Sequence, residues 1–376
     1  MMPVERVLVI GGGFSGMSAA ISLARLGCAV DLVEIDPLWR PEGAGISISS
    51  ATLRALDRLG VYPQVVAAGF VSDGLDVLTP SGAPIATLPT PRAAGADVAG
   101  GAGILRADLA RILADTVQAS GVRCRIGVTY DRIEQDRDGV EVRFTDGMAG
   151  RYDLVIGADG VQSSTRRWLF PEHAAPTYLG QVVWRAIVPR PARIERVTMW
   201  MGGGVKLGVN PVSAGEMYMF ITESRAEHPL PPRAAWAGLV QALVGGFPDP
   251  LLAGLLPELA RPTARLDVRA LSNLLVPRPW NRGRVLLIGD TVAATTPHLA
   301  SGAGIGIESG IVLAESLAGA ATLEAALERF HDRRFARCAM VIRNSEALCR
   351  LEMTQGSRDE HARIARESMR ALAEAI

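Results

Sequence analysis

The chain has 376 residues, of which 48% are hydrophobic and 21% charged, values typical of a folded globular protein rather than a disordered or fibrous one. Basic and acidic residues both total 39, and no basic stretch is dense enough to neutralise a phosphate backbone, which argues against nucleic acid as a partner. The length predicts two intimate domains or one large one.

Cysteine, histidine and hydrophobic patterns exclude several further classes. The four cysteines and five histidines are scattered and never form a C-x-x-C pair, so we expect no metal site and no disulfide framework. The charge-free run 7–24 contains three consecutive glycines and three serines, which fits a strand, turn and helix better than a membrane span. Without a secretory pattern, a cytoplasmic location is expected.

The N-terminal region predicts a β-α-β unit. Residues 4–10 form a buried strand, residues 14–26 have helical apolar spacing that ends at Gly27, and residues 29–35 form a second strand. Two parallel strands joined by a helix require a right-handed crossover and a parallel sheet. The pattern then predicts helices, a hairpin and a buried strand at 50–59, 106–119, 129–144 and 153–157.

The middle of the chain has a different texture. Strand-like segments separated by proline and glycine occupy 181–188, 197–201, 205–209 and 216–222, followed by helices 234–244 and 251–259 and a segment 265–271. The strand-and-helix pattern of the N-terminal region returns with a strand at 284–288 and a helix at 302–317, and residues 323–376 are helical. Residues 75–79 resemble an edge strand. We therefore predict a discontinuous dinucleotide-binding domain (1–74, 106–170 and 276–320), an inserted β-sheet domain (75–105 and 171–275) and a C-terminal helical segment (321–376).

The motif Gly11-x-Gly13-x-x-Gly16 follows the first strand and opens the first helix, and Glu34 ends the next strand. In such a motif the first glycine permits a tight turn, the second lets the backbone approach a pyrophosphate and the third lets helix and strand pack closely. Glu34 would accept hydrogen bonds from a ribose. The motif occurs once, so one dinucleotide is expected to bind in this way; the alternative is a glycine-rich turn without a ligand.

A family resemblance rests on a set of motifs that occur in one order along the chain: Gly11–Gly16 with Glu34, 40–46, Leu105–Leu109, Ile156–Gly160, and Gly289-Asp290 ahead of Pro297. Together they resemble the single-component FAD-dependent aromatic hydroxylases, a family of flavoprotein monooxygenases. The stretch 295–304 is similar to the salicylate-hydroxylase-like branch of that family.

The resemblance implies an α/β fold in which a Rossmann-type FAD-binding domain carries an inserted β-sheet substrate domain and C-terminal helices. It implies a monooxygenase that binds FAD, takes electrons from transiently bound NADH or NADPH, and uses O2 through a flavin hydroperoxide to hydroxylate a small aromatic or N-heteroaromatic substrate. A homodimer is one possible assembly.

The resemblance also implies site residues. Asp290 would meet the ribityl chain of FAD, although a simple turn carboxylate is the alternative, and Asp159 would lie near the pyrophosphate. The segment 297–305 would bring backbone N–H groups near the flavin ring. The complete set of expected cofactor-binding residues is Gly11, Gly13, Phe14, Ser15, Gly16, Glu34, Arg40, Arg106, Asp159, Asp290, Pro297, Gly302, Ala303 and Gly304.

Three residues are candidates for catalysis. Arg185, in a Trp-Arg pair similar to that of the family's inserted sheet, would hold a substrate anion or the flavin edge; a plain surface arginine is the alternative. Tyr218 alternates with Met217 along a strand of which one face would wall a substrate cavity; the alternative is that both faces pack against core and helices. His298 follows Pro297 and would transfer a proton, or else have no such role.

Two departures from the family pattern keep other functions open. The expected histidine after Gly289-Asp290 is absent, so its structural hydrogen bonds must be made by other groups, and the usual acidic pair is Glu308-Ser309. A flavin oxidase or reductase without oxygen insertion, or a non-catalytic FAD-binding protein, would carry the same FAD motifs. A halogenase is disfavoured because those enzymes use an early lysine and Lys206 is the only lysine in the chain.

Overall fold

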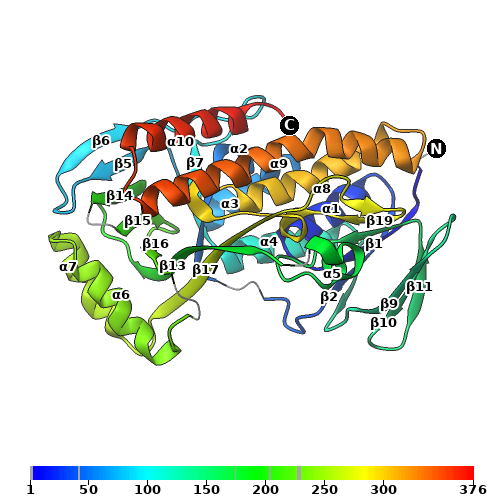
Figure 1. The fold of residues 1–376 in the computed structure, drawn as a ribbon, viewed down its shortest axis with the longest axis horizontal. Helices are drawn as coiled ribbons and strands as arrows, with labels where there is room; N and C mark the ends of the chain where they lie inside the picture. Colours follow the sequence, from blue (N-terminus) through cyan, green and yellow to red (C-terminus); the bar gives the residue numbers. More distant parts are fainter. Residues whose placement is uncertain (1–2, 41–42, 174, 203–204, 227–229) are drawn as a thin grey trace.

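The computed structural model describes residues 3–40, 43–173, 175–202, 205–226 and 230–376 (Figure 1). Segments from the N-terminal half and from residues 281–287 form a six-stranded sheet in the order β18-β19-β12-β1-β2-β8. The strands are β1 (Arg6–Ile10), β2 (Ala29–Glu34), β8 (Arg123–Ile126), β12 (Leu154–Gly157), β18 (Asn281–Arg282) and β19 (Val285–Leu287). All neighbours except β18 and β19 pair in parallel, which confirms the predicted parallel sheet.

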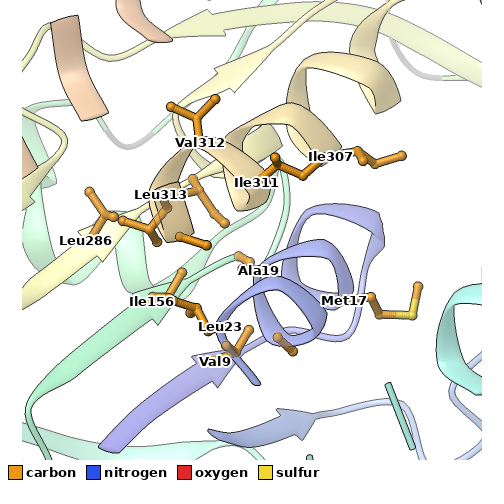
Figure 2. Close-up of a cluster of buried hydrophobic side chains, with 14 of the residues drawn as sticks. Val9, Met17, Ala19, Leu23, Ile156, Leu286, Ile307, Ile311, Val312 and Leu313 are labelled. Carbon is orange, nitrogen blue, oxygen red and sulfur yellow. The ribbon is translucent and has the colours of Figure 1, made fainter. Parts of the chain in front are cut away.

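The main hydrophobic core lies between this sheet and two helices, α1 (Phe14–Arg25) and α8 (Gly302–Ala318). Figure 2 shows apolar side chains of the strands meeting those of the two helices in this core. Central strands that are buried on both faces read as continuous valine, isoleucine and leucine runs, which is why they were recognisable in the sequence. The helices approach closely because a Cβ on Gly310 would lie 2.4 Å from the backbone nitrogen of Ala19.

Two three-stranded antiparallel sheets and four helices surround this core. One sheet contains β9 (Tyr130–Gln135), β10 (Val140–Phe144) and β11 (Ala149–Tyr152), and the other contains β3 (Gly45–Ser49), β7 (Gly101–Leu105) and β4 (Phe70–Ser72). The helices are α2 (Ser50–Arg58), α3 (Tyr62–Ala68), α4 (Arg106–Ala119) and α5 (Ser164–Leu169).

The inserted region forms an eight-stranded sheet in the order β20-β17-β13-β16-β15-β14-β5-β6. Its strands are β5 (Leu75–Leu78), β6 (Pro84–Leu88), β13 (Thr177–Pro189), β14 (Val197–Gly202), β15 (Val205–Pro211), β16 (Glu216–Ser224), β17 (Arg265–Leu275) and β20 (Ala293–Ala294). The edge strand at this end of the sheet is β6, whereas β5, predicted as an edge, lies between β6 and β14. The domain boundaries drawn from the sequence stay a prediction.

The two faces of the eight-stranded sheet differ in polarity. Met217, Met219 and Ile221 join a second apolar core with α6 (Trp236–Gly245) and α7 (Pro250–Ala260). Tyr218 and Thr222 alternate with them and therefore lie on the opposite face. Packing thus shows which face of the strand is buried in the apolar core and which face is polar, a question that strand alternation alone left open.

Two C-terminal helices, α9 (Leu323–Met353) and α10 (Arg358–Ala373), complete the fold, and α9 runs along much of the molecule (Figure 1). Glu308 of α8, 1% exposed, binds Arg334 and Arg337 of α9 at 2.9 and 2.8 Å. Arg337 also donates to the carbonyl oxygen of Leu372 near the end of α10, at 2.7 Å. The fold class predicted from the sequence is confirmed. No helix within the described residues is long and apolar enough to span a membrane.

Candidate functional site

The turn Gly11–Gly16, called the glycine turn below, joins β1 to α1 and requires glycine at two positions. Gly11 has φ +105°, and a Cβ there would lie 2.5 Å from the carbonyl oxygen of Ala158. A Cβ on Gly16 would lie 2.0 Å from the carbonyl oxygen of Gly11. By contrast, a Cβ on Gly13 would meet no protein atom within 4 Å. The turn therefore presents an open backbone surface at Gly13.

The N-terminus of α1 is suited to an anion. Its N-cap residue, Gly13, makes no side-chain capping hydrogen bond, and the first turn holds no acidic residue. Backbone N–H groups at an uncapped helix N-terminus, together with the helix dipole, attract phosphate. At the adjoining position, Glu34 accepts hydrogen bonds from the backbone nitrogens of Gly12 (2.7 Å) and Asp36 (2.8 Å). These contacts fix the carboxylate beside the turn.

Three segments far apart in the sequence meet at Ser15. A Cβ on Gly289 or Gly306 would lie 2.1 or 2.3 Å from the Ser15 hydroxyl oxygen, so the short 3-10 turn η3 (Gly289–Thr291) and α8 pack directly on α1. The next residue, Asp290, is exposed, yet burial by the surrounding protein raises its pKa to about 6 against the opposing charge of Arg106. The carboxyl of Asp290 is therefore accessible to a ligand hydroxyl and close to the positive charge of Arg106.

The segment after Asp290 is held by groups other than the family's histidine. The Thr291 hydroxyl accepts a hydrogen bond from the backbone nitrogen of Gly160 (3.2 Å), and the Thr291 carbonyl oxygen accepts one from Arg166 (2.9 Å). Arg166 is fully buried and also donates to the carbonyl oxygen of Val161 (2.7 Å). Sequence reasoning missed Arg166, because nothing in the local pattern distinguishes it from its neighbour Arg167.

Asp159 has a local structural role. Its carboxylate accepts hydrogen bonds from the Ser163 hydroxyl (2.5 Å) and from both the backbone nitrogen and the hydroxyl of Thr165 (3.0 Å each). These bonds cap the start of α5. The expected placement of Asp159 near a pyrophosphate stays a prediction.

A cluster of charged residues forms where the polar face of the eight-stranded sheet meets the glycine turn and Asp290. We call it the arginine cluster; it consists of Arg106, Arg185, Tyr218, Asp267, Arg269 and Asp290. Arg106 is the first residue of α4, and its guanidinium lies 5.1 Å from the centre of the Phe14 ring. Burial and the like charge of Arg185 lower the pKa of Arg106, while Asp290 raises it.

The sheet contributes Arg185 and Tyr218, the two predicted catalytic residues that the structure brings together. Arg185 Nη1 lies 3.7 Å from Asp267 Oδ2, and its Nε is buried without a hydrogen-bond partner among the described residues. Burial raises the pKa of Tyr218, although Arg185 and Arg106 oppose the shift, so the phenol is protonated at neutral pH. A Cβ on Gly45 would lie 2.5 Å from Tyr218 Cβ, so β3 passes directly beside this side chain.

His298 is not brought into this cluster. Its side chain is completely buried, with Nδ1 2.8 Å from the Thr296 hydroxyl and Nε2 3.2 Å from Glu352 Oε2. The charged groups around it are Glu352, Lys206 and His361, and burial lowers its pKa below the ordinary value. The structure therefore gives this imidazole a buried acidic partner in place of access to the arginine cluster.

The segment before α8, which we call the flavin loop (residues 295–301), lies next to a second uncapped helix N-terminus. Pro297 is exposed, Gly302 and Ala303 are partly exposed, and the N-cap Ser301 makes no side-chain capping bond. A Cβ on Gly304 would lie 2.2 Å from the Thr52 hydroxyl, so glycine there permits close packing on α2.

Arg40, the last of the expected cofactor residues, is exposed. Residues 41 and 42 of the predicted 40–46 motif lie outside the described residues. The site thus contains two uncapped helix N-termini, an acid beside the first, and the exposed carboxyl of Asp290, which follows a glycine packed on both helices. This donor and acceptor set fits FAD.

Comparison with known proteins identifies the class. A family model described as an FAD binding domain matches residues 5–345, so the chain belongs to this family. It is an FAD-dependent monooxygenase of the single-component aromatic hydroxylase family, as its motifs predicted. The particular branch stays a prediction.

Its relatives are distant but similar over most of their length. The chain is 32% identical to aurachin C monooxygenase/isomerase of Stigmatella aurantiaca, over 86% of this chain and 83% of the relative. It is also 32% identical to 2-heptyl-3-hydroxy-4(1H)-quinolone synthase of Pseudomonas aeruginosa, over 82% and 79% of the two chains. The crystal structure of Klebsiella pneumoniae HpxO with FAD and uric acid shares the fold, with a TM-score of 0.79, 24% identity, and coverage of 98% and 92%.

Proposed function

We propose that this enzyme uses NADH or NADPH and O2 to hydroxylate a small aromatic or N-heteroaromatic substrate that binds at the arginine cluster. The observation that carries the proposal is the position of that cluster, where the polar face of the substrate sheet meets the segments suited to FAD. Relatives named for a quinolone and for 3-amino-4-hydroxybenzoate support this substrate class.

In this proposal the chain's own residues bind and orient the cofactor. The glycine turn and the N-terminus of α1 bind the pyrophosphate, Glu34 accepts from a ribose, and Asp290 accepts from the ribityl chain. FAD, when bound, supplies the redox chemistry that activates oxygen, while the protein orients the substrate and excludes water.

Arg185 and Tyr218 are proposed to orient the substrate ring. Three arginines and two aspartates give the cluster an excess of positive charge, which favours a substrate bearing a carboxylate, phenolate or carbonyl group. The buried Arg185 Nε, without a partner in the described part of the chain, supplies a donor, and the protonated Tyr218 hydroxyl supplies another. His298 has no part in this arrangement.

The test measures pyridine-nucleotide consumption and product mass in the same reaction. The protein is mixed with FAD, NADH or NADPH, and a panel of phenolic, quinolone and pyridine acids. Substrate-stimulated oxidation with a gain of one oxygen atom is expected. Hydrogen peroxide without an oxygenated product would indicate an oxidase, and bound FAD without any such oxidation would indicate a non-catalytic flavoprotein.

A cytoplasmic location and a homodimer belong to the same proposal. Analytical sedimentation tests whether the protein is a dimer.

A further inference from the structure

Glu352, in the last turn of α9, contacts four side chains from four other elements. Its Oε1 lies 2.8 Å from Lys206 Nζ and 3.2 Å from His361 Nε2. Its Oε2 lies 3.2 Å from His298 Nε2 and 3.4 Å from the Thr222 hydroxyl. We call these five residues the Glu352 hub. They join α9 to strands β15 and β16 of the substrate sheet, to the flavin loop, and to α10.

The position of this acid is unusual. Glu352 lies beyond residue 345, where the match to the family model ends, and one of its partners is the chain's only lysine. A negative charge in the last turn of a helix is unfavourable with respect to the helix dipole. Removing a carboxylate from water is also unfavourable unless partners compensate, and Glu352 is only 13% exposed. The presence of an acid in the last turn of α9 is therefore explained by the partners of Glu352 and not by helix preference.

The charges within the hub are defined. Burial alone would raise the pKa of Glu352, but Lys206, His298 and His361 hold it well below the ordinary value, so the carboxylate stays ionised. Burial keeps His298 neutral at pH 7. A neutral imidazole can accept the Thr296 hydroxyl proton at Nδ1, and its Nε2 lies 3.2 Å from Glu352 Oε2 without hydrogen-bond geometry. Lys206 is the partner that balances the charge of Glu352.

The hub contacts the flavin loop on one side only. His298 is fully buried against Glu352 while the preceding Pro297 is exposed. Two residues later, Ala300 adopts a left-handed conformation with φ +48°, which is unfavourable for a residue other than glycine and persists where the surroundings hold it. Both α9 and α10 pack against this part of the loop. The loop is therefore held by α9 and α10 on the side where His298 is buried, and Pro297 is exposed on the other side.

We propose that Glu352 is a positioning residue: paired with Lys206, it fixes the flavin loop against the substrate sheet and thereby sets the position of the bound flavin ring relative to that sheet. The inference rests on the proposed placement of the ring beside the flavin loop. Glu352 acts through His298 and Lys206 and does not itself touch the cofactor.

The first experiment compares Glu352→Gln with Glu346→Gln in the full-length chain. Glu346 lies on the same helix and also joins α9 to the sheet, through Asn273 of β17 at 2.5 Å, but its partners do not include the flavin loop. FAD affinity is measured by flavin fluorescence, and the environment of the ring by visible circular dichroism. We expect E352Q to bind FAD about tenfold more weakly with an altered flavin spectrum, since it loses a charged hydrogen-bond network. E346Q is expected to match the wild type in both.

The second experiment exchanges the charges of the pair. Lys206→Glu and Glu352→Lys are each expected to weaken FAD binding, and the double variant is expected to bind FAD more tightly than either single variant, because contacting residues are coupled. Wild-type affinity and spectrum in E352Q, an equal loss in E346Q, or no recovery in the exchanged pair would each overturn the proposal. Oxygen insertion is read from product mass, so its absence would count against the proposed function and not against the hub.

Discussion

The glycine turn and the arginine cluster are both suited to bind parts of one ligand, yet they are built differently. The glycine turn and Glu34 lie within 24 consecutive residues, and their geometry depends on backbone atoms and on missing side chains. The arginine cluster is assembled from α4, β13, β16, β17 and η3, and it depends on side chains that contact only after folding. We therefore expect substitutions in the first to act on cofactor affinity and those at Arg185 and Tyr218, which the sheet contributes to the second, to act on substrate.

The largest effect is expected at the glycine turn. Gly16→Ala places a methyl group 2.0 Å from a backbone oxygen, so FAD affinity should fall at least about a hundredfold and the melting temperature of the FAD-free protein should fall as well. Gly13→Ala meets no protein atom, so it should weaken FAD binding while leaving that melting temperature unchanged. Fluorescence titration and calorimetry check both; equal behaviour of the two variants would contradict the assigned roles.

The next effect concerns the arginine cluster. Arg185→Met removes a charged donor from the substrate face, and we expect kcat/KM for a substrate found in the mass screen to fall about thirtyfold with FAD affinity retained. Arg265→Met is the matched control, because Arg265 lies on neighbouring β17 but is half exposed and paired with Glu216. Steady-state kinetics and flavin titration provide the measurements. If R185M lost FAD instead, the cluster would belong to cofactor binding.

Asp290 belongs to the arginine cluster but is proposed to contact the cofactor, and its substitution should affect both FAD binding and stability. Asp290→Asn should weaken FAD binding about tenfold by removing a charged acceptor. The pKa of this carboxyl is 3.8 in the unfolded chain and about 6 in the folded protein, so between these values only the folded protein holds the proton. Its contribution to stability is therefore lost as pH rises from about 4 through about 6.

The FAD-free D290N protein should accordingly melt higher than the wild type above pH 6, and the difference should vanish below about pH 4. Calorimetry across this range checks the sign. A stability difference that grows toward low pH would show that the carboxyl is not desolvated in the folded protein.

The smallest effect is expected at Thr291. Thr291→Val removes the acceptor of the Gly160 N–H group, and one such bond contributes about 1 kcal/mol. The melting temperature should fall by about 2 °C. Thr291→Ser, which keeps the hydroxyl, should stay close to the wild type. If T291V melted like the wild type, Thr291 would not replace the missing histidine.

The contrast between local backbone features and side chains that meet only after folding also explains how much of the fold and of the site the sequence could predict. The parallel sheet, α4 and α8 were recognisable because their apolar spacing and glycine stops are local features. Strands β3, β4 and β7 were not, since all three are short and paired only through tertiary contacts, and β3 and β7 are rich in small residues. Arg185 and Tyr218 were candidates from a family motif and from strand alternation, but only packing against α6 and α7 shows which face of the sheet is polar.

His298 shows the limit most clearly. Its place in the sequence, after Pro297 in the segment that the resemblance puts beside the flavin, made it a candidate acid or base. Its buried side chain lies against Glu352, more than fifty residues later, and no local pattern contains that information. The spacing of residues in the sequence therefore could not decide whether His298 transfers a proton.

The single lysine has a practical consequence. Reagents directed at side-chain amines have one target in this chain, and in the folded protein that target is 14% exposed and paired with an acid. The rate at which Lys206 is acylated, read from the mass of one peptide, would therefore report how often the C-terminal helices separate from the sheet beneath them.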